Sequence, residues 1–258
     1  MDSLSIHIVP VLKDNYVYLI VNGAEHTCIA VDPGVSRPIL AKAEELGCKL
    51  THILNTHCHW DHCDGNIDLK NATACYVVGS RHDAARIPGI DRQVVDGDVL
   101  RLCGVDIHVL GTPGHTTGDV SYFCPDLHAL FPGDSLFPMG CGRLFEGTPG
   151  DMWQSMQKLK ALPGDTKVYS AHEYTVANSR FAAHIDPHNP AVKAAAERAK
   201  TLRGSDECTL PVILGDELQC NPFLRADEPE FQKELGMEGM SAVEVFAHVR
   251  RTKDGFKG

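Results

Sequence analysis

The chain has 258 residues, a formal net charge of -10 and a hydrophobic fraction of 43%. This length suits one large α/β domain, with or without an appendage. The acidic balance argues against a general nucleic-acid or membrane-surface binder, which would normally present a basic face. No run approaches the roughly 18 apolar residues of a membrane-spanning helix, and no basic start marks a secretory signal.

The 10 cysteines are scattered and form no Cys-x-x-Cys pair, in a chain long enough to build an apolar core. Cys28 and Cys75 lie inside the apolar runs "TCIAVD" and "ACYVV" and are interpreted as small core residues. We therefore expect mostly reduced thiols and a cytoplasmic location. Because nothing in the sequence bears on oligomeric state, a monomer is the default expectation.

Short runs of strand-forming residues alternate with turns over the first two thirds of the chain. The predicted strands cover residues 5–11, 16–21, 28–32, 50–57, 72–79, 98–104, 105–111, 119–124, 128–134 and, ending at His172, 167–172. Apolar residues at helical spacing predict helices over 37–47, where Gly47 fits a C-cap, and over 150–162.

The composition changes near residue 175. Beyond it, residues 176–185, 190–204 and 241–253 have helical patterns, and no strong strand is predicted between them. We therefore predict two domains: an α/β domain over residues 1–175 and a helical, substrate-binding extension over residues 176–258.

The segment "NTHCHWDH" follows the apolar run "THIL" and places His57, His59, Asp61 and His62 at the end of this predicted strand and just beyond it. His57 and His59 would point in opposite directions on a helix, which argues against a helical His-Glu-x-x-His zinc site. On an extended segment they share a side, and Asp61 and His62 follow as the chain curls. One loop can therefore offer ligands to two adjacent metal ions.

Three further candidates also lie at the ends of predicted strands: His115 in "GTPGHTTGD", Asp134 in "LFPGDSLF" and His172 in "VYSAHEYT". Imidazole and carboxylate are preferred ligands of zinc and also suit iron or manganese. Asp134 could bridge two ions at the separation that two-metal hydrolysis uses. A lone histidine after a strand is usually an ordinary surface or core residue, so only the joint pattern indicates a metal site. Cys58 and Cys63 flank the ligands and are interpreted as supporting or packing residues.

With "THCHWDH", "TPGHTTG", "PGD" and "AHEYT" in this order, the sequence resembles the metallo-β-lactamase superfamily. Within it, the chain is similar to the hydroxyacylglutathione hydrolases, or glyoxalase II enzymes. That closer similarity lies in "VLKDNYVYLI", "AVDPG", "GCGRLFEGT", "AHEYTVANSRFA", "NPFLR" and "VRRTKDGFK". It covers essentially the whole chain and implies a four-layer αβ/βα sandwich with a small C-terminal helical domain.

The resemblance also implies a site of two divalent metal ions, zinc first, with iron or manganese as alternatives. His57, His59 and His115 would bind one ion, Asp61, His62 and His172 the other, and Asp134 would bridge them. The implied reaction is the hydrolysis of S-D-lactoylglutathione to D-lactate and glutathione by a metal-bridging hydroxide, a step of methylglyoxal detoxification. Asp61 and Asp134 would be the catalytic carboxylates, with Asp61 orienting the hydroxide. A thiolate leaves readily, so little general-acid help is needed.

The partner implied is a small-molecule glutathione thioester. The residues matching the family's substrate contacts are Arg143, Phe145, Tyr174, Arg250 and Lys253, of which the cations suit the carboxylates of glutathione. On spacing alone, Arg250 and Lys253 would be a solvated helix end. The sequence departs from the family pattern at two positions. Phe145 stands where many members have tyrosine and would lack a hydroxyl contact to the substrate, and Asp64 replaces one glycine of the commoner pair.

An alternative interpretation is that the protein is a persulfide dioxygenase of the same superfamily. Such an enzyme uses a single iron held by two histidines and one aspartate. It also acts on a glutathione derivative and shares "GCGR". The continuation "LFEGT" and the helical tail with "VRRTKD" favour the thioesterase. A nuclease would need a basic phosphate-binding face, which the acidic composition disfavours.

Overall fold

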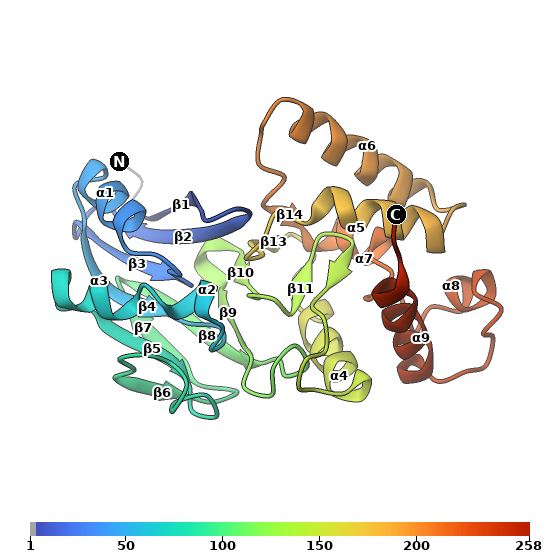
Figure 1. Cartoon of the computed structure of the whole chain (residues 1–258), viewed down its shortest axis with the longest axis horizontal. Coiled ribbons are helices and arrows are strands. Elements are labelled where there is room, and N and C mark those ends of the chain that lie inside the picture. The colour runs from blue at the N-terminus through green and yellow to red at the C-terminus, as the bar shows by residue number, and fades with distance from the viewer. Residues whose placement is uncertain (1–3) are drawn as a thin grey trace. The chain divides into compact units, whose positions relative to one another are not determined.

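Two units make up the computed structural model, which describes residues 4–258 (Figure 1). Unit 1 comprises the chain up to Gly111 together with Gly118–Gly133, and unit 2 comprises Thr112–Thr117 together with Asp134–Gly258. Residues 1–3, where the predicted α/β domain begins, lie outside the described residues. The predicted domain boundary at residue 175 lies inside unit 2 and stays a prediction.

Unit 1 begins with a mixed sheet in the order β1-β2-β3-β4-β5-β6. Strands β1 to β3 pair antiparallel through tight turns, whereas β3 to β6 run parallel. Helical segments connect β3 to β4 and β4 to β5, and a series of turns connects β5 to β6. The bounds are β1 Leu4–Val11, β2 Asn15–Asn22, β3 Thr27–Val31, α1 Arg37–Glu45, β4 Lys49–Leu54, α2 Trp60–Cys63, α3 Asn66–Thr73, β5 Tyr76–Ser80 and β6 Arg92–Val94.

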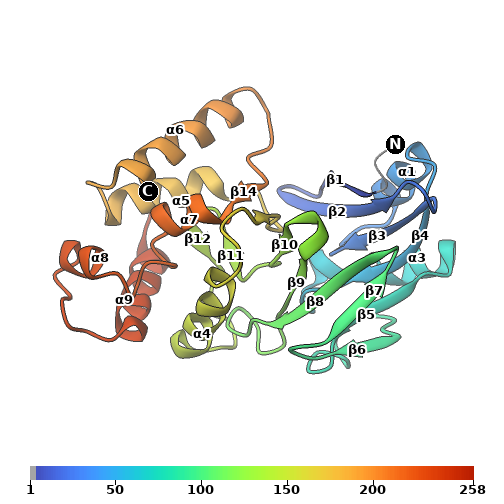
Figure 2. The ribbon, with the colours of Figure 1, turned by 180° about the vertical axis from the view of Figure 1, so that it is seen from behind.

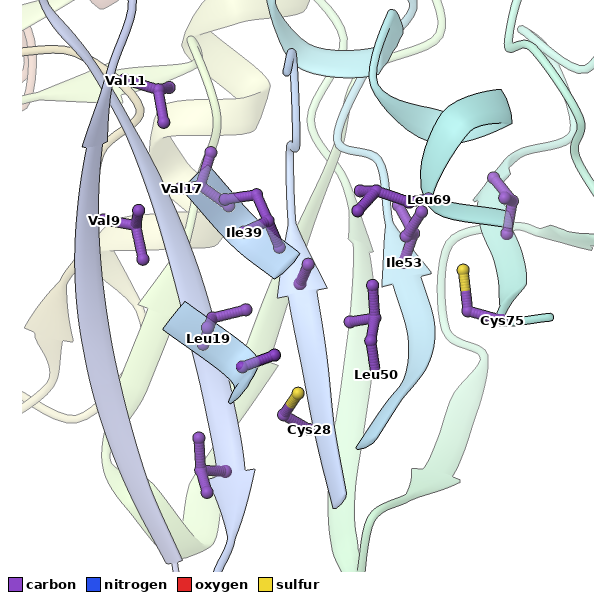
Figure 3. Packing of buried hydrophobic residues seen from close by; sticks show 14 of the residues in the cluster. Val9, Val11, Val17, Leu19, Cys28, Ile39, Leu50, Ile53, Leu69 and Cys75 are labelled. Carbon is purple, nitrogen blue, oxygen red and sulfur yellow. The ribbon is translucent and has the colours of Figure 1, made fainter. Parts of the chain in front are cut away.

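The two faces of this sheet are covered differently. Alternate residues of β2, including Val17 and Leu19, turn to the face where Ile39 of α1 and Leu69 of α3 complete an apolar core (Figure 3). The residues between them face the other way, and the Tyr18 ring lies 5.5 Å from that of Phe131. Strand β2 is therefore buried along its whole length, as a strand inside a layered α/β fold should be.

The opposite face packs on strands of a second sheet, in the order β10-β9-β8-β7. Their bounds are β7 Val99–Leu102, β8 Val105–Gly111, β9 Val120–Cys124 and β10 Ala129–Phe131, with a 3₁₀ turn at Pro125–Leu127. Two buried polar contacts join the sheets: the Tyr122 hydroxyl donates to the Asn55 carbonyl at 2.9 Å, and the Asn22 amide donates to the Cys103 carbonyl at 2.9 Å. The first contact fixes where β4 ends relative to β9, and the second joins the end of β2 to the turn between β7 and β8.

Unit 2 consists of a small hairpin, short strands and helices (Figure 2). Helix α5 packs on α6 and α6 on α7, while α4 packs on α9. The bounds are β11 Leu136–Phe137, β12 Gly140–Cys141, α4 Pro149–Lys160, β13 Lys167–Val168, α5 Thr175–Ile185, α6 Pro190–Gly204, β14 Val212–Ile213, α7 Leu214–Cys220, α8 Pro229–Glu234 and α9 Ala242–Gly255.

The helices predicted from apolar spacing are confirmed as α1, α4, α5, α6 and α9, and Gly47 has the positive φ of +63° expected after a helix. The prediction missed α2, α3, α7 and α8, the strands β6, β11 and β12, and β14 in the segment expected to lack strands. These elements are short, so their patterns carry few apolar residues. Among residues 4–258, no helix is both long and apolar enough to span a membrane.

Candidate metal centre

The histidine-rich segment of unit 1 leaves β4 as extended chain and then turns once as α2, with His59 at the N-cap. Asn55, buried at the end of β4, holds this turn by donating from its side chain to the His62 carbonyl at 2.8 Å. The Asn66 amide donates to the Asn55 side-chain oxygen at 2.7 Å. The curl predicted for Asp61 and His62 is therefore one helical turn, anchored by two asparagines.

The imidazoles of this segment lie close together. The Nε2 atom of His57 is 3.0 Å from Nδ1 of His59, and the His57 and His62 ring centroids are 4.1 Å apart. The Nε2 atom of His62 lies 3.5 Å from Oδ2 of Asp61. His57 and His62 are almost fully buried. Unit 1 thus gathers the predicted ligands His57, His59, Asp61 and His62 at one place.

Asp32, directly after β3, determines which ring nitrogen carries the proton in two of these histidines. Its carboxylate accepts from the Thr56 backbone N–H and from the Thr56 hydroxyl, each at 2.7 Å, and from Nδ1 of His62 at 3.1 Å. Because the Thr56 hydroxyl donates to Asp32, it accepts from Nδ1 of His57, 3.0 Å away. In both histidines Nδ1 therefore carries the proton and Nε2 offers its lone pair.

Asp32, His57 and His62 also place ligand atoms within 4.8 Å of one another. The carboxylate of Asp32 already accepts three hydrogen bonds, so it acts as the outer partner of the histidines rather than as a ligand. Asp61 has its own partner, since the Asn15 amide donates to its Oδ2 at 3.0 Å. Gly34 allows the close approach, because a Cβ there would lie 2.0 Å from the Asp61 carbonyl oxygen.

In unit 2, His115 lies in the turn that also contains Gly114. Its Nδ1 lies 2.8 Å from the Arg143 carbonyl, which can only accept, so Nδ1 carries the proton and Nε2 faces Asp134 Oδ2 at 3.5 Å. Gly142 completes a tight cradle: a Cβ there would lie 2.1 Å from the Asp134 carbonyl oxygen and 3.0 Å from His115 Nδ1.

His172 faces the other oxygen of the same carboxylate. Its Nε2 lies 3.3 Å from Oδ1 of Asp134. The Tyr174 ring stacks on the His172 imidazole, with 4.7 Å between centroids and 2° between planes. Unit 2 thus gathers His115, Asp134 and His172, with one carboxylate oxygen facing each imidazole. That is the arrangement expected of a bridging carboxylate.

The predicted substrate residues Arg143, Phe145 and Tyr174 are accessible and close to this cluster. Phe145 is 60% exposed, and its ring lies 5.2 Å from that of His115. The Arg143 guanidinium lies 5.9 Å from the Phe145 ring centroid, and its Nε is 3.8 Å from Asp254 Oδ1. These side chains can therefore meet a ligand without rearrangement of the backbone.

The other two predicted substrate residues, Arg250 and Lys253, differ in their burial and in their contacts. Arg250 is only 6% exposed. Its two terminal guanidinium nitrogens already donate within the protein, one to the Cys141 carbonyl at 3.0 Å and one to Asp254 at 2.8 Å. Lys253 is half-buried, with Nζ 5.0 Å from the Phe181 ring centroid. Burial, helped by the positive charge of Arg250, lowers the pKa of Lys253 to about 8.

Sequence reasoning missed Asn15, Asp32 and Thr56, the residues that orient the predicted ligands. Asn15 and Asp32 lie in "VLKDNYVYLI" and "AVDPG", two of the segments that carry the family resemblance. The available signal was a polar residue at the end of an apolar strand, the same signal that revealed the ligands. Asp32 also has a left-handed φ of +53°, which is uncommon outside glycine.

The donors in both units suit a divalent metal. Each cluster combines imidazole nitrogens, with protons held away from the cluster by fixed acceptors, and carboxylate oxygens. Neutral imidazole and carboxylate are the ligands of zinc, iron and manganese in proteins. The residues present therefore fit a metal centre.

Comparison with known proteins first identifies the superfamily to which the chain is related. The model of the metallo-beta-lactamase superfamily matches residues 12–172. A crystal structure of ETHE1 from Myxococcus xanthus is similar, with a TM-score of 0.69, 27% identity, and coverage of 96% of this chain and 90% of that one. The predicted metallo-β-lactamase fold, an α/β sandwich with a C-terminal helical region, is confirmed.

Further comparisons identify the family within this superfamily. The model "Hydroxyacylglutathione hydrolase C-terminus" matches residues 173–256. Proteins named hydroxyacylglutathione hydrolase from Rhodospirillum rubrum and Methylococcus capsulatus are each 50% identical to this chain, covering 99% and 97% of it and 100% and 98% of their own lengths. The chain belongs to the hydroxyacylglutathione hydrolase family.

Proposed function

We propose that the protein hydrolyses S-D-lactoylglutathione, or a closely related 2-hydroxyacylglutathione, to the hydroxy acid and glutathione. The observation that carries this proposal is identity of 50% along essentially the whole chain to proteins named for that reaction. The match of the C-terminal family model supports it, since the helical region is included. We therefore prefer the interpretation as a thioesterase to the interpretation as a dioxygenase.

We propose that two divalent ions take part, with zinc the first choice. His57, His59 and His115 would bind one ion, Asp61, His62 and His172 the other, and Asp134 both. The supporting observations are the clusters within each unit and the orientation of the Nε2 atoms. When bound, the ions would act as Lewis acids and lower the pKa of a water molecule.

The chain's own residues would prepare the reaction by orientation. Asp61, held at Oδ2 by the Asn15 amide, would accept a hydrogen bond from the attacking water and aim it at the thioester carbonyl. Asp134 would keep its two oxygens between His115 and His172. The departing thiolate of glutathione is a weak base, so no side chain has to donate a proton to it.

Substrate capture would fall mainly to Arg143, Tyr174 and Lys253. Arg143 is exposed, and Tyr174 presents an edge at 37% exposure beside His172. With a pKa of about 8, Lys253 is mostly protonated at neutral pH and can attract a glutathione carboxylate. Phe145 would contribute apolar contact only. The burial of Arg250 favours a role in holding the segment before Arg143.

The test combines metal analysis with thioester hydrolysis by the purified protein. Metal-loaded protein should release one thiol per S-D-lactoylglutathione consumed, and His57→Ala should lower kcat/KM by about 100-fold or more. His108→Ala, an exposed histidine on β8, is the matched control and should retain full activity. Absence of hydrolysis at every metal loading would contradict the proposal, and oxygen uptake with glutathione persulfide would favour the dioxygenase.

We also propose a cytoplasmic monomer. A glutathione thioester substrate and scattered cysteines both fit a reducing compartment. Sedimentation of the purified protein at a mass of one chain would support the monomer, and a stable dimer would contradict it.

A further inference from the structure

One small hairpin, residues 135–143, connects two parts of the candidate site. It consists of β11 and β12, paired as Leu136 with Cys141 and Phe137 with Gly140. Asp134 comes immediately before it, and Arg143 ends it. Only two pairs of residues hold the strands together, and an isolated hairpin of this size is not stable in water. Its shape must therefore come from contacts with the rest of unit 2.

Helix α7 supplies the main contacts at the tip. The Met139 backbone N–H donates to Glu217 Oε2 at 2.7 Å. Met139 has a left-handed φ of +51°, a strained conformation for a methionine that needs fixed partners. Glu217 is only 2% exposed, so its carboxylate is placed in the interior of unit 2 to accept this bond. A buried carboxylate without such donors would be strongly unfavourable.

Asn221 follows Glu217 by one helical turn and begins the "NPFLR" segment, one of those that carry the family resemblance. It is fully buried. Its side-chain amide nitrogen lies within hydrogen-bond distance of the Phe137 carbonyl at 3.0 Å, the Gly140 carbonyl at 3.1 Å and Glu217 Oε2 at 3.0 Å. One amide thus contacts both strands of the hairpin and the carboxylate that holds its tip.

Two other helices contact the same hairpin. The Asn178 amide of α5 donates to the Pro138 carbonyl at 3.1 Å, and a Cβ on Gly140 would lie 2.4 Å from that amide nitrogen. Arg250 of α9 donates to the Cys141 carbonyl at 3.0 Å. Helices α5, α7 and α9 therefore each hold a different part of the hairpin, from its tip to its second strand.

The hairpin in turn touches the metal-ligand candidates. The Arg143 carbonyl at its end accepts from His115 Nδ1 at 2.8 Å and so orients the imidazole. The backbone of Gly142 passes so close to Asp134 and His115 that even a methyl group would not fit between them. A shift of the hairpin by about 1 Å would therefore turn the His115 ring or displace Asp134, a scale of misplacement that matters for metal and substrate geometry.

We infer that Glu217 and Asn221 are positioning residues of the metal centre: they hold the hairpin 135–143 in the conformation that orients His115 and Asp134. The inference rests on the proposed function for the identity of the ligands. It assigns to α7 and the "NPFLR" segment a role in metal binding and turnover, although neither residue contacts a proposed ligand.

The test compares Glu217→Ala with Glu217→Gln and with Asp216→Ala, a control that removes the exposed carboxylate of the preceding residue on the same helix. Zinc affinity is measured by competition with a chromophoric chelator, and kcat and KM with the thioester. Glu217→Ala removes the acceptor for Met139 and should weaken zinc binding and lower kcat by about 10-fold or more, as loss of outer-shell support commonly does. KM should change by less than about threefold, since substrate contacts remain.

Glu217→Gln retains an acceptor oxygen and should restore zinc affinity and kcat to within about threefold of the natural protein. A role confined to stability would instead lower the melting temperature while leaving the zinc affinity of the folded protein unchanged. Folded Glu217→Ala with the zinc affinity and kcat of Asp216→Ala would overturn the inference.

Asn178→Ala is the second variant, in case Glu217→Ala does not fold. It removes the donor to Pro138 from a different helix, and alanine is well tolerated within a helix. It should weaken zinc binding in the same direction, and unchanged affinity would again overturn the inference. Zinc affinity is measured without substrate, so protein that binds zinc normally but hydrolyses no thioester would contradict only the proposed function.

Discussion

At the scale of single residues, three histidines of the candidate centre have one ring nitrogen engaged by a fixed partner. Nδ1 of His57, His62 and His115 lies within 3.1 Å of Thr56, Asp32 and the Arg143 carbonyl respectively. Since each Nδ1 donates, Nε2 is the nitrogen that can bind a metal. The protein thus selects the tautomer through its own hydrogen bonds, which lowers the cost of binding an ion.

Asp32→Asn tests this selection. The substituted side chain has one oxygen in place of two, so it cannot accept from Thr56 N, Thr56 Oγ1 and His62 Nδ1 together. Metal affinity should fall about 10–100-fold, and the metal-stripped protein should lose about 1–3 kcal/mol of unfolding free energy. Chelator competition and urea unfolding measure the two effects.

The control for Asp32→Asn is Asp106→Asn, since Asp106 is 46% exposed and makes only a loose 3.8 Å pair with Arg101. It should change neither metal affinity nor stability. An unaltered metal affinity in Asp32→Asn would show that Asp32 does not select the tautomer.

How much of the site can be predicted from the sequence depends on how far apart along the chain the contacting residues lie. His57, His59, Asp61 and His62 lie within six positions, so their grouping is visible directly. The partner of His62 is 30 residues away and that of His115 is 28 away. Such pairs depend on which strand ends meet in the fold, and local pattern does not contain that information.

Lys253 gives a prediction about pH. Its pKa is lowered to about 8, so the ammonium loses its proton as the pH rises through about 8, and attraction for a substrate carboxylate declines. KM for the thioester should therefore rise between about pH 7 and 9. Lys253→Arg should remove this rise, because arginine stays protonated. Lys253→Ala should show a high KM at every pH, and an unchanged pH profile in Lys253→Arg would contradict the assignment.

At the scale of elements, sequence patterns predict long helices and fail for short pieces. Helix α6 has the predicted bounds, Pro190–Gly204, because Asn189 caps its start and apolar residues recur along it. Strands β11 and β12 have two residues each, and side chains of α5, α7 and α9 determine their conformation. No local propensity can reveal an element whose hydrogen-bond partners lie about 80 residues away, as for Asn221 and Phe137.

Helix α4 shows a local signal that can be measured. Its capping box pairs the Thr148 hydroxyl with the Asp151 N–H at 3.2 Å, and the Asp151 carboxylate with the Thr148 N–H at 2.9 Å. Thr148→Ala should reduce the unfolding free energy by about 1 kcal/mol and the melting temperature by about 2–4 °C. Gln154→Ala, exposed in the same helix, should stay within about 0.5 kcal/mol. Equal melting temperatures for the two variants would exclude a contribution from the cap.

At the scale of the whole molecule, the proposed ligands are divided between the units. His57, His59, Asp61 and His62 belong to unit 1, and His115, Asp134 and His172 belong to unit 2. If ligands from both units bind the same ions, metal binding must stabilise the folded chain as a whole, because the unfolded chain does not assemble the site. Independent half-sites would stabilise each unit separately.

A double-mutant cycle distinguishes these cases. His59 and His115 are assigned to the same ion, one from each unit, and His59→Ala or His115→Ala should each remove most of the zinc-dependent rise in melting temperature. The double variant should lose no more than either single variant, since an ion that has lost one ligand gains little from the other. Melting curves with and without a chelator give the zinc-dependent part, and His108→Ala should keep all of it. Additive losses would mean that the two histidines bind different ions, and the proposed two-ion centre would have to be abandoned.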